Sequence, residues 1–420
     1  MTHPLATNEQ RELEALALRI AATPAVRAAR EKARALLLGN PSAMTRDGAA
    51  GLDRALDQWV MGGVVAIANN DPSRPRGLWA IDNTPREWFG HVFPGAAVAI
   101  DNPDNVNRTA PLDGAWEYRI NGRFGKNPTA QTSFIVTPAA EGQLRLGGTI
   151  AALTNLDLQT DDDGNFTITL NKRPAAGRIN HMQIVDGPQM LAIRDSHSDW
   201  RQQATAIHIL RENGPAPAPP LSEEALVRAA AETIVDFVAF WLEFKNTFWK
   251  TPPFNQVIGP LGRDGGWGYQ AGGRFKLADD EAFVITTRDG GAAYTGFQVS
   301  DPWTISPYPF YATTSRNSSQ VTPNPDGSHT YVISLVDPGV ANWIDTAGLH
   351  EGWFMLRWQN LKSVEPQSLL QSAQLVRLAE IEKSLSPGTP RVTLQQRSAE
   401  ILKRTREYES RYRTHAPADQ

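Results

Sequence analysis

A small group of ionisable side chains lies near the carboxyl end of the chain. Asp345, His350 and Glu351 fall within seven residues of one another. An acid, an imidazole and a second acid on one loop can transfer a proton, because each group changes the pKa of its neighbours. The alternative is a solvated connection in which Asp345 caps its own turn. The sequence leaves both interpretations open.

An aromatic segment upstream of this group ends in an arginine and two amides. Prolines interrupt the segment, whose main residues are Trp303, Tyr308, Phe310, Tyr311, Arg316, Asn317 and Gln320. A stiff aromatic wall beside a guanidinium suits a ring-bearing carboxylate or a sugar stacked on aromatic rings. Core packing at a strand crossover explains the aromatic residues equally well. It explains the arginine less well, because a buried guanidinium needs a partner.

We therefore predict a site in the second half of the chain. The predicted catalytic residues are Asp345, His350 and Arg316. The predicted substrate-binding residues are Trp303, Tyr308, Tyr311, Asn317, Gln320, Asn342 and Trp343. The first half offers an equally dense group, Arg194, Asp195, His197 and Asp199, for which a hydrogen-bonded loop is the better interpretation.

The sequence contains no recognisable metal or cofactor motif. Its eight histidines form no H-x-H or H-E-x-x-H pattern, and cysteine is absent. Asp161, Asp162 and Asp163 lack the remaining ligand spacing of a calcium loop and fit the tip of a hairpin. No P-loop, G-x-S-x-G motif or dinucleotide fingerprint occurs. We expect neither a metal nor a cofactor.

The elements that must position these residues occur twice in the chain. The markers Phe134, Gly164 and Arg194 recur as Phe297, Gly327 and Arg357, each pair being 163 residues apart. A constant offset between scattered markers indicates duplication of one β-rich domain. In a duplicated scaffold, one copy can acquire polar residues and specialise while the other supports it.

Turn signals beside alternating runs indicate antiparallel sheets. Asn121-Gly122 predicts a two-residue hairpin, because a type I′ turn needs positive φ at both central residues. Asp163-Gly164, Asp289-Gly290 and Asp326-Gly327 repeat the pattern. The predicted fold class is α+β, mainly β, with two related antiparallel β-sandwich domains and with N-terminal, central and C-terminal helices.

Helical patterns surround the two β-rich regions. The N-terminal helices end at Gly62-Gly63, and their amphipathic stripe is expected to cover a sheet face or a second subunit. A polyproline linker over 215–220 leads into an apolar helix, which we predict to lie between the two β domains. Residues 367–384 and 393–412 predict charged helices of a terminal arm or an oligomer contact.

The predicted domains follow from these boundaries. They are an N-terminal helical cap (1–63), a first β-sandwich (64–214), a linker with a buried central helix (215–250), a second β-sandwich (251–362) and a C-terminal helical arm (363–420).

Composition limits the partners. A net charge of −4 in 420 residues argues against a large nucleic-acid footprint. The first ten residues are polar, and no run approaches the ~20 apolar residues that cross a bilayer. We therefore expect a cytoplasmic protein without nucleic-acid or membrane partners, and with a homo-oligomer contact through its terminal helices.

Five segments together resemble the bacterial domain-of-unknown-function family numbered twelve-fourteen. They are Ile100 to Arg108, D-D-G-N-F-T-I-T-L, Arg194 to Trp200, Arg316 to Gln320 and Asp337 to Gly348, within residues 75–360. The resemblance implies β-sandwich domains with attached helices and carries no agreed activity. One departure is Asn180-His181, where an N-W pair is expected.

Two functions remain open from the sequence. The first is a cofactor-independent hydrolase or lyase acting on a hydrophobic, aromatic or glycosidic small molecule near the junction of the two sandwiches. The alternative is a non-catalytic protein that binds an apolar or ring-bearing ligand or builds an oligomeric assembly.

Overall fold

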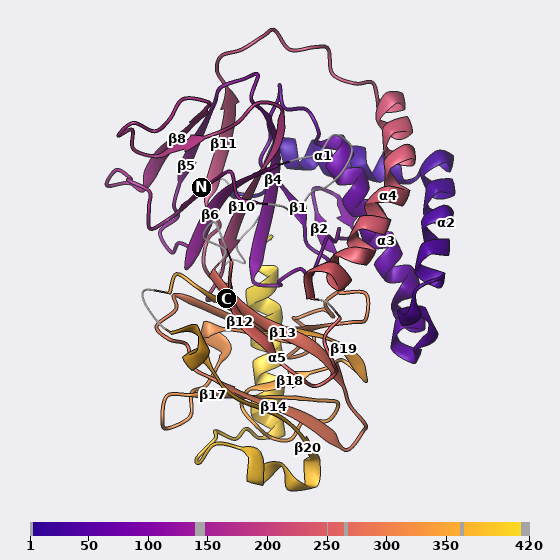
Figure 1. The fold of residues 1–420 in the computed structure, drawn as a ribbon, viewed down its shortest axis with the longest axis vertical. Coiled ribbons are helices and arrows are strands. Elements are labelled where there is room, and N and C mark those ends of the chain that lie inside the picture. The colour runs from indigo at the N-terminus through magenta and orange to yellow at the C-terminus, as the bar shows by residue number, and fades with distance from the viewer. Residues whose placement is uncertain (1–2, 139–147, 250, 264–267, 362–364, 413–420) are drawn as a thin grey trace.

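The computed structural model describes residues 3–138, 148–249, 251–263, 268–361 and 365–412. Residues 245–249 are described by their backbone alone. Two β-sandwiches lie one above the other, and most of the helices flank the upper one (Figure 1).

The first sandwich packs a five-stranded sheet on a four-stranded one. The five-stranded sheet has the order β1 (Leu78–Ile81), β4 (Asn105–Asp113), β10 (Pro188–Ser196), β6 (Gln131–Pro138) and β7 (Ala151–Thr154). The four-stranded sheet has the order β11 (Ala206–Arg211), β5 (Tyr118–Arg123), β8 (Asn165–Asn171) and β9 (His181–Gln183). Alternate residues point inward, so that Phe134, Ile168, Leu191 and Ile193 form the core between the sheets.

The second sandwich repeats this arrangement. Its five-stranded sheet has the order β12 (Ile258–Arg263), β13 (Gly268–Lys276), β19 (Glu351–Gln359), β15 (Tyr294–Ser300) and β16 (Ser315–Asn317). Its four-stranded sheet has the order β18 (Trp343–Asp345), β17 (His329–Ser334), β14 (Glu281–Thr287) and β20 (Leu370–Arg377). Phe283, Phe297, Ile333 and Leu356 lie in its core.

The two sandwiches agree in strand order, and their five-stranded sheets also agree in register. Arg194 of β10 lies opposite Asn107 and Ser133, and Arg357 of β19 lies opposite Gln270 and Gly296. The partners are again 163 residues apart, so the prediction of two related sandwiches is confirmed. The sheets are not wholly antiparallel, because β9 and β18 each pair in parallel with a neighbour.

Three of the four predicted turns are present, but they are not hairpins. Gly164, Gly290 and Gly327 have φ of 77°, 63° and 78°, and each turn links strands of different sheets. The Asn121-Gly122 prediction is wrong, because both residues lie inside β5. Gly122 is required there by packing: a Cβ atom would lie 2.1 Å from Cζ of Phe166.

Four long helices form a layer beside the first sandwich (Figure 1). They are α1 (Asn8–Ala21), α2 (Pro24–Leu38), α3 (Arg46–Ala68) and α4 (Glu223–Trp249), with the 3-10 helix η1 (Pro41–Met44) between α2 and α3. Ile20, Leu37, Trp59 and Ile234 belong to their shared core. The predicted place of α4 between the two sandwiches is wrong, because the N-terminal helices offer α4 an apolar surface.

Helix α3 continues through Gly62-Gly63, where the sequence predicted its end. Both glycines lie where neighbours approach closely. A Cβ atom would lie 2.6 Å from the Ala97 oxygen at Gly62 and 3.3 Å from the Phe237 ring at Gly63. The glycines therefore allow close packing and do not end the helix.

A short hairpin links the helical layer to the first sandwich. It consists of β2 (Arg86–Trp88) and β3 (His91–Phe93). Its turn residues Phe89 and Gly90 have φ of 55° and 81°. Positive φ at both positions is the geometry of a type I′ turn, which a bulky residue such as phenylalanine seldom adopts.

The carboxyl-terminal region contains a strand where a helix was predicted. It comprises η3 (Pro366–Leu369), strand β20, η4 (Leu378–Ser384) and α5 (Leu394–Glu409), while η2 (Ser318–Gln320) lies earlier in the chain. The prediction of a helix over 367–384 is wrong, because β20 pairs with β14 and completes the second sandwich. Main-chain hydrogen bonds offered by the edge of β14 override the helical propensity of this segment.

Helix α5 is confirmed, but it lies against its own chain. Thr393 caps it in a capping box with Gln396. Arg397, Arg404 and Arg411 repeat every seven residues and are all buried. They donate to the carbonyl oxygens of Val340, Pro309 and Pro103, respectively. The helix therefore fastens the second sandwich to the segment before β4 of the first, and the oligomer contact stays a prediction.

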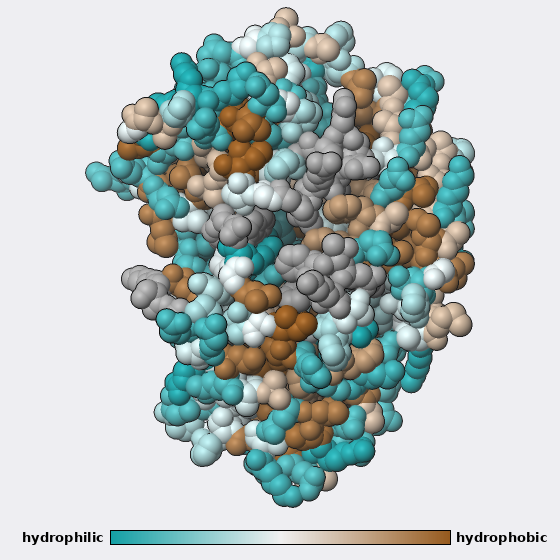
Figure 2. All heavy atoms as spheres, in the orientation of Figure 1, coloured by the Kyte–Doolittle hydropathy of each residue, from teal (hydrophilic) through white to brown (hydrophobic). Residues whose placement is uncertain are grey.

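Apolar residues on the visible surface occur in several patches separated by hydrophilic residues (Figure 2). In the described part of the chain, no helix has the length and apolar character needed to cross a membrane.

Candidate functional site

Arg316 is an anchor for α5. Its side chain is 1% exposed. Nη1 donates to Glu400 Oε1 at 2.6 Å and to the backbone carbonyl oxygen of Gln320 at 2.7 Å. Nε donates to the Trp343 oxygen at 3.1 Å. The partner that a buried guanidinium needs is thus a carboxylate 84 residues away in the sequence.

Asp345 and His350 do not join Arg316. The Asp345 carboxylate accepts from the amide of Ala347 at 2.8 Å, as expected for a turn cap, and burial raises the pKa of this carboxyl. His350 Nε2 lies 2.9 Å from Asp279 Oδ1, whose side chain is 88% exposed. The backbone amides of His350 and Glu351 are held by buried Asp47 of α3. The solvated-loop interpretation therefore describes these residues better.

The predicted aromatic residues differ in exposure, although the rings of Tyr308 and Tyr311 lie 6.5 Å apart. Trp303 is buried against the helical layer, where its Nε1 donates to the Gly48 oxygen at 2.6 Å. Tyr308 lies under the Arg54 guanidinium at 4.6 Å. Tyr311 is 67% exposed. Trp303 therefore belongs to the core, whereas Tyr311 faces solvent.

The predicted polar binding residues serve local structure. Asn317 and Gln320 close the capping box of η2, and Gln320 Oε1 also accepts from Arg404 at 2.7 Å. Asn342 binds the backbone of Thr322 through both atoms of its amide. Trp343 Nε1 donates to the Ser334 oxygen at 3.1 Å. Arg316 and Gln320 thus meet at α5, whereas Asn317 Nδ2 donates to Asp104 Oδ1 at 3.3 Å.

A buried polar network lies at the junction of the two sandwiches. Asp104 accepts from the Tyr294 hydroxyl at 2.9 Å and from Trp200 Nε1 at 2.7 Å. Burial raises the pKa of Asp104, while these two hydrogen bonds act in the opposite direction. Arg357 donates to Gln298 Oε1 at 2.7 Å. The network is closed to solvent, and it joins the sandwiches in the manner of a structural core.

Asp101 adds a second buried carboxyl to this junction. Burial, followed by the charge of Asp82, raises the pKa of Asp101 to about 7. Its Oδ1 atom accepts from the amide of Asn102 at 2.7 Å and from Asn107 Nδ2 at 3.1 Å.

His91 and Glu14 form a histidine–carboxylate pair that the sequence did not reveal. His91 Nε2 lies 3.1 Å from Glu14 Oε2, and the side chains are 21% and 1% exposed. Glu14 also accepts from Arg86 Nη2 at 2.9 Å, from Trp88 Nε1 at 2.6 Å and from Gln10 Nε2 at 3.0 Å. Four donors therefore hold this carboxylate in place.

Aromatic rings surround the pair. The Arg86 guanidinium lies 4.1 Å from the centre of the Trp79 ring and 4.9 Å from that of Phe93. Phe89, at the strained turn, lies 4.5 Å from Trp88 and 6.2 Å from His91 between ring centres. The imidazole thus lies at the edge of an aromatic surface while its carboxylate partner is in the interior.

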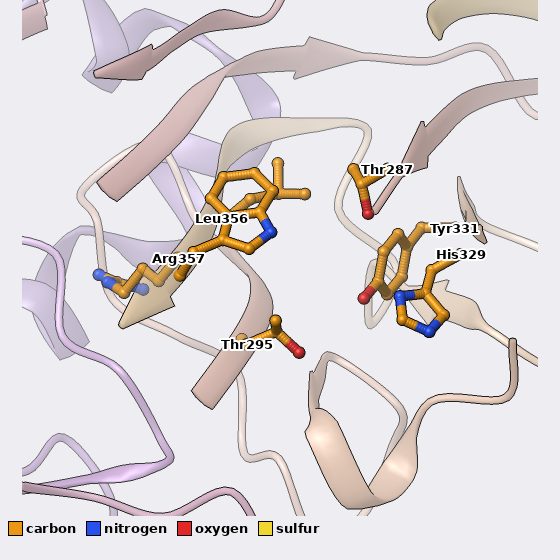
Figure 3. A pocket seen from close by; sticks show the side chains of 8 residues that line it. Thr287, Thr295, His329, Tyr331, Leu356 and Arg357 are labelled. Atoms are coloured by element: carbon orange, nitrogen blue, oxygen red, sulfur yellow. The ribbon is translucent and has the colours of Figure 1, made fainter. Parts of the chain in front are cut away.

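A narrow crevice opens at one end of the second sandwich (Figure 3). The side chains around it include Thr287, Thr295, His329, Tyr331 and Trp358. It has no room for a water molecule. Burial lowers the pKa of His329 and raises that of Tyr331 well above its ordinary value.

Within the described ranges, no cluster of three or more His, Asp or Glu side chains has the geometry of a metal site. The pairing of His91 with Glu14 could not be predicted from the sequence, because 77 residues separate the two. The same holds for Arg86, which contacts Glu14 only in the folded chain. The only local sign was the Phe89-Gly90 pair between two short apolar runs.

No protein-family model and no curated protein sequence matches the chain. Similar solved structures include an uncharacterized protein from Burkholderia cenocepacia, with 23% identity and a TM-score of 0.68, over 86% of this chain and 99% of that one. The VPA0106 protein from Vibrio parahaemolyticus matches with 12% identity and a TM-score of 0.40, over 66% and 89%. The first of these shows the fold alone, so the resemblance to family twelve-fourteen stays a prediction.

Proposed function

We propose that the protein is a hydrolase or lyase in which His91 is the general base. The observation that carries this proposal is the 3.1 Å contact between the partly exposed imidazole of His91 and the buried carboxylate of Glu14. A carboxylate in the interior that orients a histidine at the surface is the arrangement found behind many catalytic bases.

The hydrogen bond defines which nitrogen is basic. An ionised carboxylate only accepts hydrogen bonds, so Nε2 of His91 carries the proton and Nδ1 carries the lone pair. Within the described ranges, Nδ1 makes no hydrogen bond, and the side chain is 21% exposed. The basic nitrogen is therefore available to a substrate or to an attacking water molecule.

Glu14 acts as a positioning residue. It holds the ring orientation and stabilises the imidazolium that forms when Nδ1 takes a proton. Because Gln10, Arg86 and Trp88 fix the carboxylate from other directions, the imidazole has little freedom to turn away. In ester hydrolysis, Nδ1 takes a proton from water as the water oxygen attacks the carbonyl, and the proton then passes to the departing alcohol. A lyase uses the same nitrogen to remove a proton from carbon.

The surroundings favour a substrate with an apolar or ring portion. Phe89 and Trp88 lie beside His91, and partly buried Ala6 and Tyr412 belong to the same apolar cluster. A substrate ring can stack on this surface while its reacting group faces Nδ1. Holding Phe89 in the left-handed region costs about 1–3 kcal/mol, an expense that is typical of functional turns.

Turnover of p-nitrophenyl acetate and p-nitrophenyl benzoate tests the proposal. We expect His91→Ala to lower kcat/KM by about 100-fold or more, because general-base catalysis contributes about 10²–10⁴-fold. Glu14→Gln should lower kcat more than KM changes, because Glu14 orients the base and does not bind the substrate. The benzoate ester should be preferred over acetate, since only benzoate offers a second ring.

The matched control is His350→Ala in combination with Asp345→Ala. His350 also contacts a carboxylate, at 2.9 Å, but that carboxylate is exposed. This double variant should keep wild-type turnover. Equal losses in the His91 and His350 variants, or no turnover above that of buffer by the wild type, would contradict the proposal.

A further inference from the structure

Strand β20 is an exposed edge of the second sandwich. It is the last strand of the four-stranded sheet, and within the described residues it pairs with β14 alone. Its β14 neighbours Phe283, Val284 and Ile285 are fully buried, whereas the five residues 371–375 are all exposed. The sheet therefore passes from core to solvent within one strand, near the lower end of the molecule in Figure 1.

This edge is longer than the others in the molecule. β20 has eight residues, whereas the other edge strands of the two sandwiches, as far as the structure describes them, have three to six. An edge strand offers a row of N–H and C=O groups to a strand of another chain, and a short edge offers few of them. Length alone therefore makes β20 the edge best suited to pairing.

The sequence of β20 lacks the features that normally prevent such pairing. Of its residues L-Q-S-A-Q-L-V-R, only Arg377 is charged, and none is proline or glycine. Arg377 lies at the end of the strand, where Nη1 donates to Asp280 Oδ1 at 2.6 Å. The irregularity in the pairing with β14 lies at the other end, between Thr286 and Thr287. Neither a charge, a proline nor a bulge therefore protects the centre of this edge.

The first sandwich has a charge at the equivalent place. Arg211 of β11 lies opposite Tyr118, and Leu375 of β20 lies opposite Phe283. These positions are equivalent, because Tyr118 and Phe283 in turn pair with residues of β8 and β17 that are 163 positions apart. Leu375 is 42% exposed. An exposed apolar side chain thus replaces a guanidinium at this edge.

A second copy of the chain fits the edge. Antiparallel pairing of two β20 strands about a centre between Ala373 and Gln374 brings only uncharged residues opposite one another over 371–376. The same pairing places the two Arg377 side chains at opposite ends, about 24 Å apart at 3.4 Å per residue. Like charges therefore do not meet, and both copies use the same surface, as a two-fold dimer requires.

A groove beside the edge leaves room for the end of the second strand. It has a volume of about 340 Å³ and lies between the end of β20 and η4. Its charged lining residues are Glu281, Glu380, Arg377 and Lys383, two acidic and two basic. The second copy's Leu370 would lie opposite Arg377 in the antiparallel pair. An uncharged strand end suits a groove whose charges cancel.

We propose that the protein forms a homodimer in which two β20 strands pair antiparallel and join the four-stranded sheets of two copies. The contact involves about eight residues of each copy, compared with about 20–30 in a standard interface. The dimer is therefore weak, with a dissociation constant on the order of 100 µM. This contact differs from the one through the terminal helices expected from the sequence, and it is independent of His91.

Sedimentation velocity of the full-length chain, from about 5 µM to about 1 mM, tests the proposal. The mass of the wild type should rise from that of the 46.1 kDa monomer toward that of a dimer. Leu375→Arg introduces the residue type of the first sandwich and should weaken association at least tenfold. Ala373→Lys, which brings like charges together at the centre of the pair, should do the same. Circular dichroism identifies the folded variants, and Ala373→Lys decides if Leu375→Arg does not fold.

Leu402→Arg is the matched control, because Leu402 is also an exposed leucine, at 61%, but lies on α5. This variant should dimerise as the wild type does. Amide exchange in β20 should also slow as the concentration rises, while that of the edge strand β12 stays the same. A wild type that is monomeric throughout the range overturns the proposal. So does a dimer that Leu402→Arg disrupts and Leu375→Arg leaves intact.

Discussion

The two sandwiches use the same backbone arrangement to pack different chemistry at equivalent places. In the first, Arg108 Nη2 donates to Asp195 Oδ2 at 2.5 Å, and both side chains are at most 3% exposed. Thr132 and Thr205 donate hydroxyl hydrogen bonds to the other carboxylate oxygen. The residues 163 positions later are Ala271 and Trp358, an apolar pair.

A second difference lies at the neighbouring positions. Phe166 in the first sandwich lies opposite Gly122 and covers it, whereas His329 in the second sandwich lies opposite Thr287. Strand order is the same in both sandwiches, and so is the register between the central strands of the two five-stranded sheets. The fold therefore requires neither the buried ion pair nor the histidine, and each must be explained by its own surroundings. For the ion pair, the explanation is mutual compensation of charge. His329 lies opposite Thr287, with its ring 6.5 Å from that of Tyr331.

Breaking the ion pair should have the largest effect on stability. Arg108→Ala leaves the charge of Asp195 without its counter-ion, and we expect a loss of about 3–5 kcal/mol in the free energy of unfolding. Arg108→Met with Asp195→Leu gives the first sandwich an apolar pair of the kind found in the second. The double variant should lose much less than the single one, because a buried ion pair and an apolar pair are often equivalent in free energy.

Urea denaturation gives the free energy, and hydrogen exchange localises the effect. Amides of β10 should lose protection in Arg108→Ala, while those of β19 keep theirs. A double variant that is as unstable as the single one would show that the first sandwich depends on the charges themselves, and the two packing arrangements would then not be interchangeable.

Titration of Asp101 should affect stability at the junction of the two sandwiches. Its pKa is raised to about 7, so between pH 4 and 7 the native state keeps a proton that the unfolded state loses. Stability from this group is therefore present at low pH and is lost as pH rises toward 7. Asp101→Asn retains the acceptor for Asn102 and Asn107 and removes the titration. The variant should gain stability relative to the wild type between pH 5 and 8, on the order of 3 kcal/mol.

Urea denaturation at four pH values between 5 and 8 measures the difference. Asp279→Asn is the control, since that carboxylate is 88% exposed and should change the pH dependence little. Parallel curves for the wild type and Asp101→Asn would exclude titration of this carboxyl over that range.

The duplicated architecture could be predicted because its markers are local and repeated. Gly164 and Gly327 occupy equivalent turns, and the strands after them alternate in hydrophobicity. The segment 370–377 was wrongly predicted as helical, because its strand conformation depends on pairing with the distant strand β14. The end of α3 was misplaced for a similar reason, since Gly62 and Gly63 serve contacts with Ala97 and Phe237.

The candidate site could be predicted less well than the fold. Ionisable residues are indeed dense in the sequence around Asp345 and His350. Closeness in the sequence does not show, however, which of these side chains have buried partners. Glu14 and His91 come from a helix and a hairpin that meet only in three dimensions. Arg316 was correctly predicted to need a partner if buried, and that partner is Glu400.

Transfer of the second sandwich's histidine into the first gives the smallest and most specific effect. Phe166 lies 4.9 Å from Phe124 and 5.8 Å from Phe134 between ring centres, so an imidazole at this position has apolar neighbours. Phe166→His should lower the free energy of unfolding by about 1–3 kcal/mol, the usual cost of burying a polar group without a partner. The reverse change, His329→Phe, should raise it, because it removes an imidazole that already lacks a protein partner. Urea denaturation of the two variants measures both signs. If both changes destabilise equally, shape and not polarity distinguishes the position of Phe166 from that of His329.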